Sequence, residues 1–70
     1  MALEIGDKVI QIKPTQYGML KGVHIVTNIK YNFMAYPSSK FSYLHNMPAV
    51  GLEDVDYIVP EVCLIKLYNI

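Results

Sequence analysis

Short runs of β-branched and aromatic residues recur along the chain between glycine, proline and asparagine residues, and no segment shows a sustained helical period. Residues 9–12 (VIQI) and 23–31 (VHIVTNIKY) predict two strands, of which the second is the longest in the chain. Strict alternation fails inside the second run, which predicts a bend or a β-bulge there. In the first run Val9 with Gln11 and Ile10 with Ile12 are competing inward pairs, and the pattern leaves both open.

The last third of the chain contains an apolar run that Pro60 divides into residues 55–59 (VDYIV) and 64–67 (LIKL). Proline has a fixed φ and no N–H to donate, so the run cannot continue as one long strand. We therefore predict two short strands over these ranges, joined by one tight turn at residues 61–63.

The middle of the chain is predicted from its turn-forming residues. Residues 14–22 (PTQYGMLKG) begin with proline and contain two glycines, which predicts a loop of the kind that often carries binding residues. Residues 32–39 predict a turn, residues 40–45 (KFSYLH) alternate as a strand with Phe41 and Tyr43 on one face, and residues 46–54 (NMPAVGLED) predict a loop. The sum is an all-β fold of five short strands in a single domain, residues 1–70.

Hydrophobic residues make up 53% of the chain. A domain of this length buries only about 60% of its unfolded surface, so part of the apolar content is expected to stay exposed. Tyrosine beside methionine is typical of adaptable interfaces. We predict a surface that binds a protein partner, formed by Tyr17, Met19, Tyr36, Phe41, Tyr43 and Met47. The alternative is that Phe33, Phe41 and Leu44 form core and that Tyr36, Tyr43 and Met47 are ordinary surface.

The formal net charge is zero, from six lysines and six carboxylates, and the chain contains no arginine. Arginine makes the commonest specific contact to guanine, so its absence counts against nucleic-acid binding. The first 40 residues nevertheless hold five lysines against Glu4 and Asp7, a balance of +3. Nucleic-acid binding is therefore the second hypothesis, with Tyr17 or Tyr36 stacking on bases and with phosphate contacts from Lys13, Lys21, Lys30 and Lys40. Self-association as a structural component, through an exposed barrel edge or an apolar patch, is the third.

Catalytic and metal-binding patterns are not found. His24, His45 and Cys63 lack the close spacing of a structural zinc site, so neither a metal nor another cofactor is expected. Cys63 lies between Val62 and Leu64, where a buried, inert thiol is predicted. We therefore expect that the protein is not an enzyme.

The expected compartment is the cytoplasm. The lone cysteine fits a reducing environment, and the start MALEIGDK lacks the basic and apolar regions of a secretory signal. No apolar run approaches the roughly 18 residues that would span a bilayer, so no membrane association is expected.

The order of these parts resembles the SH3-like small β-barrels, including the KOW and Tudor types and the similar barrel of a small photosystem subunit. Gly6-Asp7-Lys8-Val9, the glycine-bounded loop, the long second strand and the ending from Tyr57 to Leu64 (YIVPEVCL) carry the resemblance. It implies a five-stranded barrel in which Val59 closes the fourth strand, a 3₁₀ turn follows at residues 61–63, and Leu64 returns to the core.

The first long loop lacks the carboxylates and the paired tyrosines of proline-peptide-binding SH3 domains, so recognition of proline-rich peptides is not implied. Short SH3-like chains of this kind resemble phage-encoded accessory proteins. That resemblance implies a protein that acts in the host cytoplasm, where it binds a host enzyme or complex and inhibits or redirects it.

Overall fold

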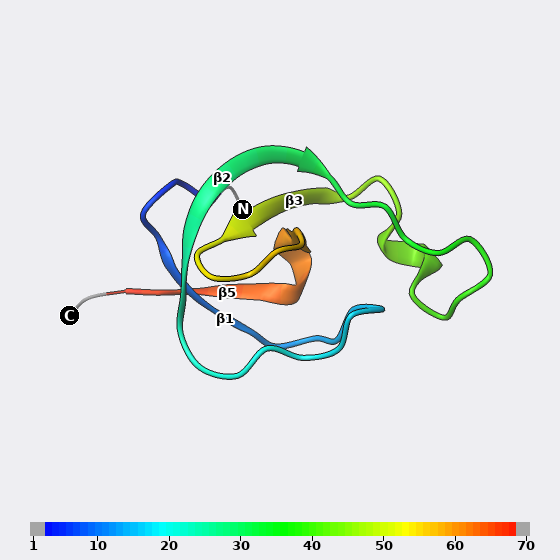
Figure 1. The fold of residues 1–70 in the computed structure, drawn as a ribbon, viewed down its shortest axis with the longest axis horizontal. Coiled ribbons are helices and arrows are strands. Elements are labelled where there is room, and N and C mark those ends of the chain that lie inside the picture. Colours follow the sequence, from blue (N-terminus) through cyan, green and yellow to red (C-terminus); the bar gives the residue numbers. More distant parts are fainter. Residues whose placement is uncertain (1–2, 69–70) are drawn as a thin grey trace.

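The computed structural model describes residues 3–68 and places five antiparallel strands in one sheet (Figure 1). The strands are β1 (Lys8–Gln11), β2 (His24–Asn32), β3 (Pro48–Leu52), β4 (Val59–Pro60) and β5 (Leu64–Leu67). The helical segments of the described residues are two single 3₁₀ turns, η1 (Ser42–Leu44) and η2 (Glu61–Cys63). The strand order in the sheet is β4-β3-β2-β1-β5, so the first strand lies between the second and the last.

Strand β1 directs Val9 and Gln11 toward the core, which decides between the two pairs that the sequence left open. Val9 is fully buried and Gln11 is buried, whereas Ile12 is about half exposed. Strand β1 pairs over its whole length with β5, from Lys8 opposite Leu67 to Gln11 opposite Leu64.

Strand β2 is the longest strand, and it is irregular as predicted. Its first residues pair with β1 and its later residues pair with β3, and the register shifts between Val26 and Asn28 and again between Asn28 and Tyr31. Lys30, within the second shift, has a φ of 71°. These irregularities accompany the arch in which β2 passes from one part of the sheet to the other (Figure 1).

The ending of the chain has the predicted break. Pro60 closes β4, the turn η2 follows, and β5 covers the predicted residues 64–67. The predicted strand over residues 55–59 is wrong in extent, because only Val59 of that range belongs to β4 and pairs with β3. Residues 55–58 instead form the end of the β3–β4 connection, with Tyr57 and Ile58 packed against the core.

Two predictions for the middle of the chain are wrong. The predicted strand over residues 40–45 is a connection that contains η1, because Phe41 and Leu44 both turn toward the core at a three-residue spacing. The predicted loop over residues 46–54 contains β3, which pairs with β2 on one side and β4 on the other. Ala49, Val50 and Leu52 of β3 are buried, so this strand is central to the sheet.

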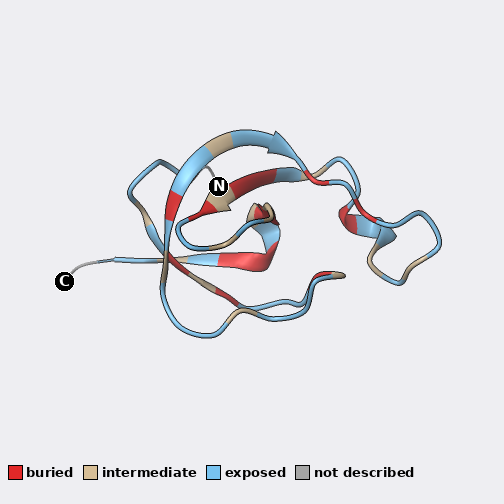
Figure 2. Ribbon diagram, viewed as in Figure 1, coloured by how far each residue is buried: buried red, intermediate tan, exposed pale blue. Residues whose placement is uncertain are grey.

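The core lies inside the curved sheet, and Figure 2 shows the buried segments of the strands facing one another. Its largest fully buried side chains include Phe33, Leu44, Val9, Val26, Val50 and Val59. The β2–β3 connection, residues 33–47, projects from one end of the molecule (Figure 1) and is fixed there by Phe33 and Leu44. The three long connections therefore remain on the surface around a small interior.

Candidate functional site

Three tyrosines from three different connections meet on the surface and form what we call the tyrosine cluster, Tyr17, Tyr36 and Tyr57. The ring of Tyr17, in the β1–β2 connection, lies 4.6 Å from the ring of Tyr57 in the β3–β4 connection, centroid to centroid. It lies 6.3 Å from Tyr36 in the β2–β3 connection, edge to face, and 6.3 Å from the buried ring of Phe33. Tyr17 is 45% exposed and Tyr36 is 56% exposed, so the cluster offers aromatic surface to a partner.

The buried amide of Gln11 fixes the connection that carries Tyr17. Its Nε2 donates to the carbonyl oxygens of Lys13 at 2.7 Å and of Gly18 at 2.9 Å, and its Oε1 accepts from the N–H of Leu20 at 2.9 Å. These hydrogen bonds hold both ends of the turn that presents Tyr17. A buried polar side chain with all these partners satisfied restricts the loop to one conformation.

Gln16 joins this turn to the segment that carries Tyr36. Its Oε1 accepts from the N–H of Tyr36 at 2.7 Å, and its Nε2 donates to the carbonyl oxygen of Met34 at 2.9 Å. The two bonds resemble one rung of a strand ladder made by a side chain. The separation between Tyr17 and Tyr36 is therefore set by hydrogen bonds as well as by ring packing.

The structure brings together two of the six predicted partner-binding residues, Tyr17 and Tyr36. Met19 and Tyr43 are exposed, and among the described residues the ring of Tyr43 forms no aromatic pair with the cluster. Phe41 is half-buried against the core, with the Lys40 ammonium 5.3 Å from its ring, and Met47 is also half-buried. The predicted surface thus draws on two connections, with Tyr17 and Met19 between β1 and β2 and the other four residues between β2 and β3.

Tyr57 is the cluster member that sequence reasoning missed. Residues 55–59 alternate like a strand, which would have placed Tyr57 in a ladder rather than against Tyr17. The segment Asp54-Val55-Asp56 could have indicated a connection in place of a strand, because aspartate is common in turns and rare in strands. Asp54 does adopt a positive φ of 63° in the β3–β4 connection.

A second surface feature is the outer aliphatic face, which we define as the half-buried Ile10 and the exposed Ile25, Ile65 and Leu67. Lys8 in β1 lies opposite Ile25 of β2 and opposite Leu67 of β5, and Ile10 lies opposite Ile65. Opposite residues of antiparallel strands point to the same face of a sheet. Part of the apolar surplus is therefore on a three-stranded surface, with the Lys8 side chain at its middle.

The four lysines of the nucleic-acid hypothesis, Lys13, Lys21, Lys30 and Lys40, are all exposed. They come from the β1–β2 connection, the bulged part of β2 and the β2–β3 connection. Nucleic-acid binding by these lysines stays a prediction.

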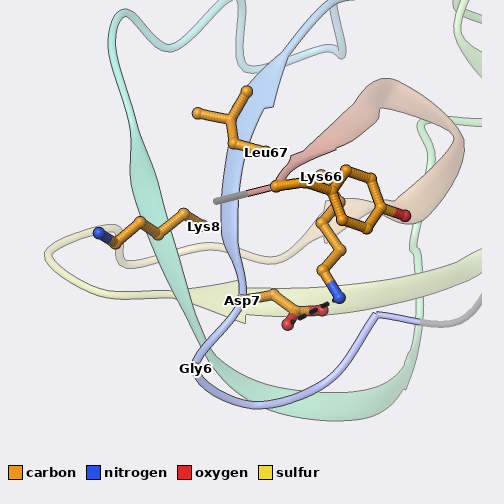
Figure 3. Close-up of a pocket in the computed structure, with 6 residues that line it drawn as sticks. Gly6, Asp7, Lys8, Lys66 and Leu67 are labelled. Carbon is orange, nitrogen blue, oxygen red and sulfur yellow. Dashed lines mark ion pairs between the residues drawn. The ribbon is translucent and has the colours of Figure 1, made fainter. Parts of the chain in front are cut away.

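A pocket of about 290 Å³ lies where the β5 end meets the Gly6-Asp7 turn (Figure 3). The ammonium of Lys66 lies 3.4 Å from the carboxylate of Asp7 and 5.1 Å from the ring of Tyr68. Asp7 also accepts the N–H of Glu4 at 2.9 Å. Lys8 points away from this ion pair, as Figure 3 shows. Of the charges that line this pocket, those of Asp7 and Lys66 are therefore paired with each other, and that of Lys8 lies outside the pair.

Cys63 is a fully buried free thiol, as predicted. Burial raises the pKa of this thiol, and the nearby Lys13 charge opposes the rise. Such a group is neutral at physiological pH and is a poor nucleophile. Within residues 3–68 no group of three or more His, Cys, Asp and Glu side chains is arranged to hold a metal ion.

No helix in the described part of the chain has the length and apolar character needed to cross a membrane. No protein-family model, curated protein sequence or solved structure matches the chain.

Proposed function

We propose that this protein is a small, non-catalytic protein-binding module whose partner docks on the tyrosine cluster. The main supporting observation is that the rings of Tyr36 and Tyr57, from two other connections, both pack against Tyr17. Tyr17 and Tyr36 are exposed and Tyr57 is half-buried. Tyrosine is enriched at the energetically dominant positions of interfaces because a rigid ring buries much area at little cost in side-chain entropy. Gln11 and Gln16 support the proposal, since they prepare the surface before a partner arrives.

The proposal includes an SH3-like barrel as the scaffold. Its support is the strand order β4-β3-β2-β1-β5 and the 3₁₀ turn η2 between β4 and β5. The resemblance to phage accessory proteins extends the proposal to a host protein in the cytoplasm, which binding would inhibit or redirect.

Affinity capture with quantitative mass spectrometry tests the proposal. The immobilised wild type is expected to retain a protein that Tyr36→Ala retains at least about 10-fold less well, because loss of a central aromatic costs about 2 kcal/mol. Tyr68→Ala is the matched control, since Tyr68 is an equally large exposed ring outside the cluster. Equal recovery by Tyr36→Ala and the wild type, or no protein enriched over the bare matrix, contradicts the proposal.

Self-association is the second candidate function, and the outer aliphatic face favours it. Ile10, Ile25, Ile65 and Leu67 would lose contact with water if two copies packed face to face, and the zero net charge removes repulsion between copies. Lys8 requires the two copies to be staggered, so that its ammonium stays in water.

Sedimentation velocity over a range of concentrations tests this second function. Dimers of the wild type that disappear in Ile65→Lys and persist in Tyr36→Ala would support it. A wild type that sediments as a monomer at every concentration would exclude it.

A further inference from the structure

The tyrosine cluster adjoins a pocket, because Tyr57 belongs to both. This pocket has a volume of about 230 Å³ and lies between β2, β3 and the β3–β4 connection. Tyr31 of β2 lines it together with Tyr57, whose ring is 4.6 Å from that of Tyr17. A partner seated on the cluster therefore lies beside the mouth of the pocket.

Gly51 in β3 leaves space at the floor of this pocket. It lies opposite Asn28 of β2, next to the register shifts. A Cβ at Gly51 would lie 3.6 Å from both Asn28 Oδ1 and Thr27 Oγ1. Because glycine has no side chain, these two oxygen atoms can accept hydrogen bonds from a group that enters the pocket.

The charge at the pocket is negative. Asp56 lines it, and Glu53 and Asp54 precede Asp56 in the same connection. Asp56 is exposed and forms no ion pair within residues 3–68. Lys30, although adjacent to Tyr31 in the sequence, lines a different pocket that includes Glu61. Among the described residues, no lysine or histidine lines this pocket, so no basic side chain there neutralises the Asp56 carboxylate.

We propose that this pocket binds a cationic side chain, lysine or arginine, which the partner presents beside the tyrosine cluster. The Asp56 carboxylate and the oxygens of Asn28 and Thr27 accept hydrogen bonds from its N–H groups. The rings of Tyr31 and Tyr57 provide favourable surface for its charge and its methylene groups. This inference rests on the proposed protein-binding function and adds the chemistry of the partner.

Nuclear magnetic resonance titration with small probes tests the inference without the partner. N-acetyl-lysine methylamide is expected to shift the backbone amide signals of Gly51, Asp56 and Tyr57 in a saturable manner at millimolar concentration. N-acetyl-norleucine methylamide, which has a similar chain without the ammonium, is expected to cause no saturable shift. Equal responses to the two probes, or no response to either the lysine probe or its arginine counterpart, overturn the inference.

Two variants locate the binding. Asp56→Asn is expected to lower the affinity for the lysine probe about fivefold. Gly51→Ala is expected to lower this affinity as well, because the added methyl group fills the space beside Asn28 and Thr27. Asp54→Asn is the matched control, because it removes the same charge from the same connection and asparagine tolerates a φ of 63°. If Asp54→Asn and Asp56→Asn lower the affinity for the lysine probe equally, the probe responds to the general negative charge of the connection and not to the pocket. That result would overturn the inference.

The two proposals fail separately. Tyr36 does not line the pocket, so its variant tests the protein-binding function alone. A partner that depends on Tyr36, together with no response to either cationic probe, overturns the cationic pocket and leaves the protein-binding function in place. A saturable response to the lysine probe supports the pocket whatever the capture experiment yields.

Discussion

The side-chain amide of Gln11 donates to the carbonyl oxygen of Gly18 at 2.9 Å and thereby connects the buried face of β1 to the turn beside Tyr17. Gln11 is 7% exposed, and its amide serves three backbone groups across the β1–β2 connection. Gln11→Leu is expected to lower the free energy of unfolding by about 1–3 kcal/mol, because it leaves those backbone groups without a partner. Urea unfolding followed by circular dichroism measures the change.

Gln16→Leu is the control for this prediction. Its bonds to Met34 and Tyr36 are exposed, so water replaces them and the expected loss is below about 1 kcal/mol. If the two variants lose the same stability, burial of the Gln11 amide is not what fixes the loop.

Glycine is required at one position of the β1–β2 turn and merely tolerated in β3. Gly18 has a φ of +97°, so Gly18→Ala is expected to cost about 1–2 kcal/mol. Gly51 lacks a positive φ, and a Cβ there meets Asn28 at an ordinary 3.4 Å, so Gly51→Ala is expected to change stability by less than about 0.5 kcal/mol. Thermal unfolding of the two variants side by side checks the prediction, and a larger loss for Gly51→Ala would refute it.

Glu61 links the start of the described chain to η2, because its Oε1 accepts the N–H of the buried Leu3 at 2.8 Å. Glu61→Ala is expected to cost about 1 kcal/mol and to speed hydrogen exchange of the Leu3 amide, whereas Glu61→Gln keeps an acceptor oxygen and most of the protection. Exchange measured by nuclear magnetic resonance gives the result residue by residue. An unchanged Leu3 exchange rate in Glu61→Ala would show that this bond does not hold the segment.

The buried thiol of Cys63 makes stability depend on pH in a defined direction. Burial raises the pKa of the folded thiol above its unfolded value, with the Lys13 charge opposing the rise. The contribution of the buried thiol to the free energy of unfolding is therefore fully present below the unfolded thiol pKa and is lost as the pH rises through the raised folded pKa. The wild type is expected to lose unfolding free energy relative to Cys63→Ala across that range, as measured by urea unfolding at several pH values.

Alkylation gives an independent check on the same thiol. The folded protein is expected to react with iodoacetamide at least about 10-fold more slowly than the urea-unfolded chain. Equal rates would show that Cys63 is accessible in solution.

Local chemistry explains the parts of the fold that the sequence predicts correctly. Strands β1 and β2 are rich in β-branched residues, β5 is a short apolar run, and the break at Pro60 follows from a missing N–H. Strand β3 was missed because Pro48 and Gly51 are residues that normally weaken strands. Pro48 is tolerated as the first residue of the strand, and Gly51 lies opposite Asn28 beside the bulges, so pairing with β2 and β4 outweighs local preference.

The candidate site was predictable in kind but not in arrangement. Residues 40–45 fit a two-residue period as well as the three-residue period that buries Phe41 and Leu44, and only packing decides between the two. The sequence predicted that Tyr17 and Tyr36 belong to a partner-binding surface, and the structure shows that both are exposed. Their proximity depends on Gln16, and the contribution of Tyr57 depends on how the β3–β4 connection folds. Such contacts join distant residues, so no local pattern reports them.

The central place of β1 also bears on how the protein is made. During synthesis β1 can pair with β2 early, but its other edge waits for β5 until Leu64–Leu67 leaves the ribosome. A nascent chain that stalls before this point displays an open strand edge beside an unfinished core, which invites pairing with other chains. Completion of folding is therefore coupled to the final residues of β5.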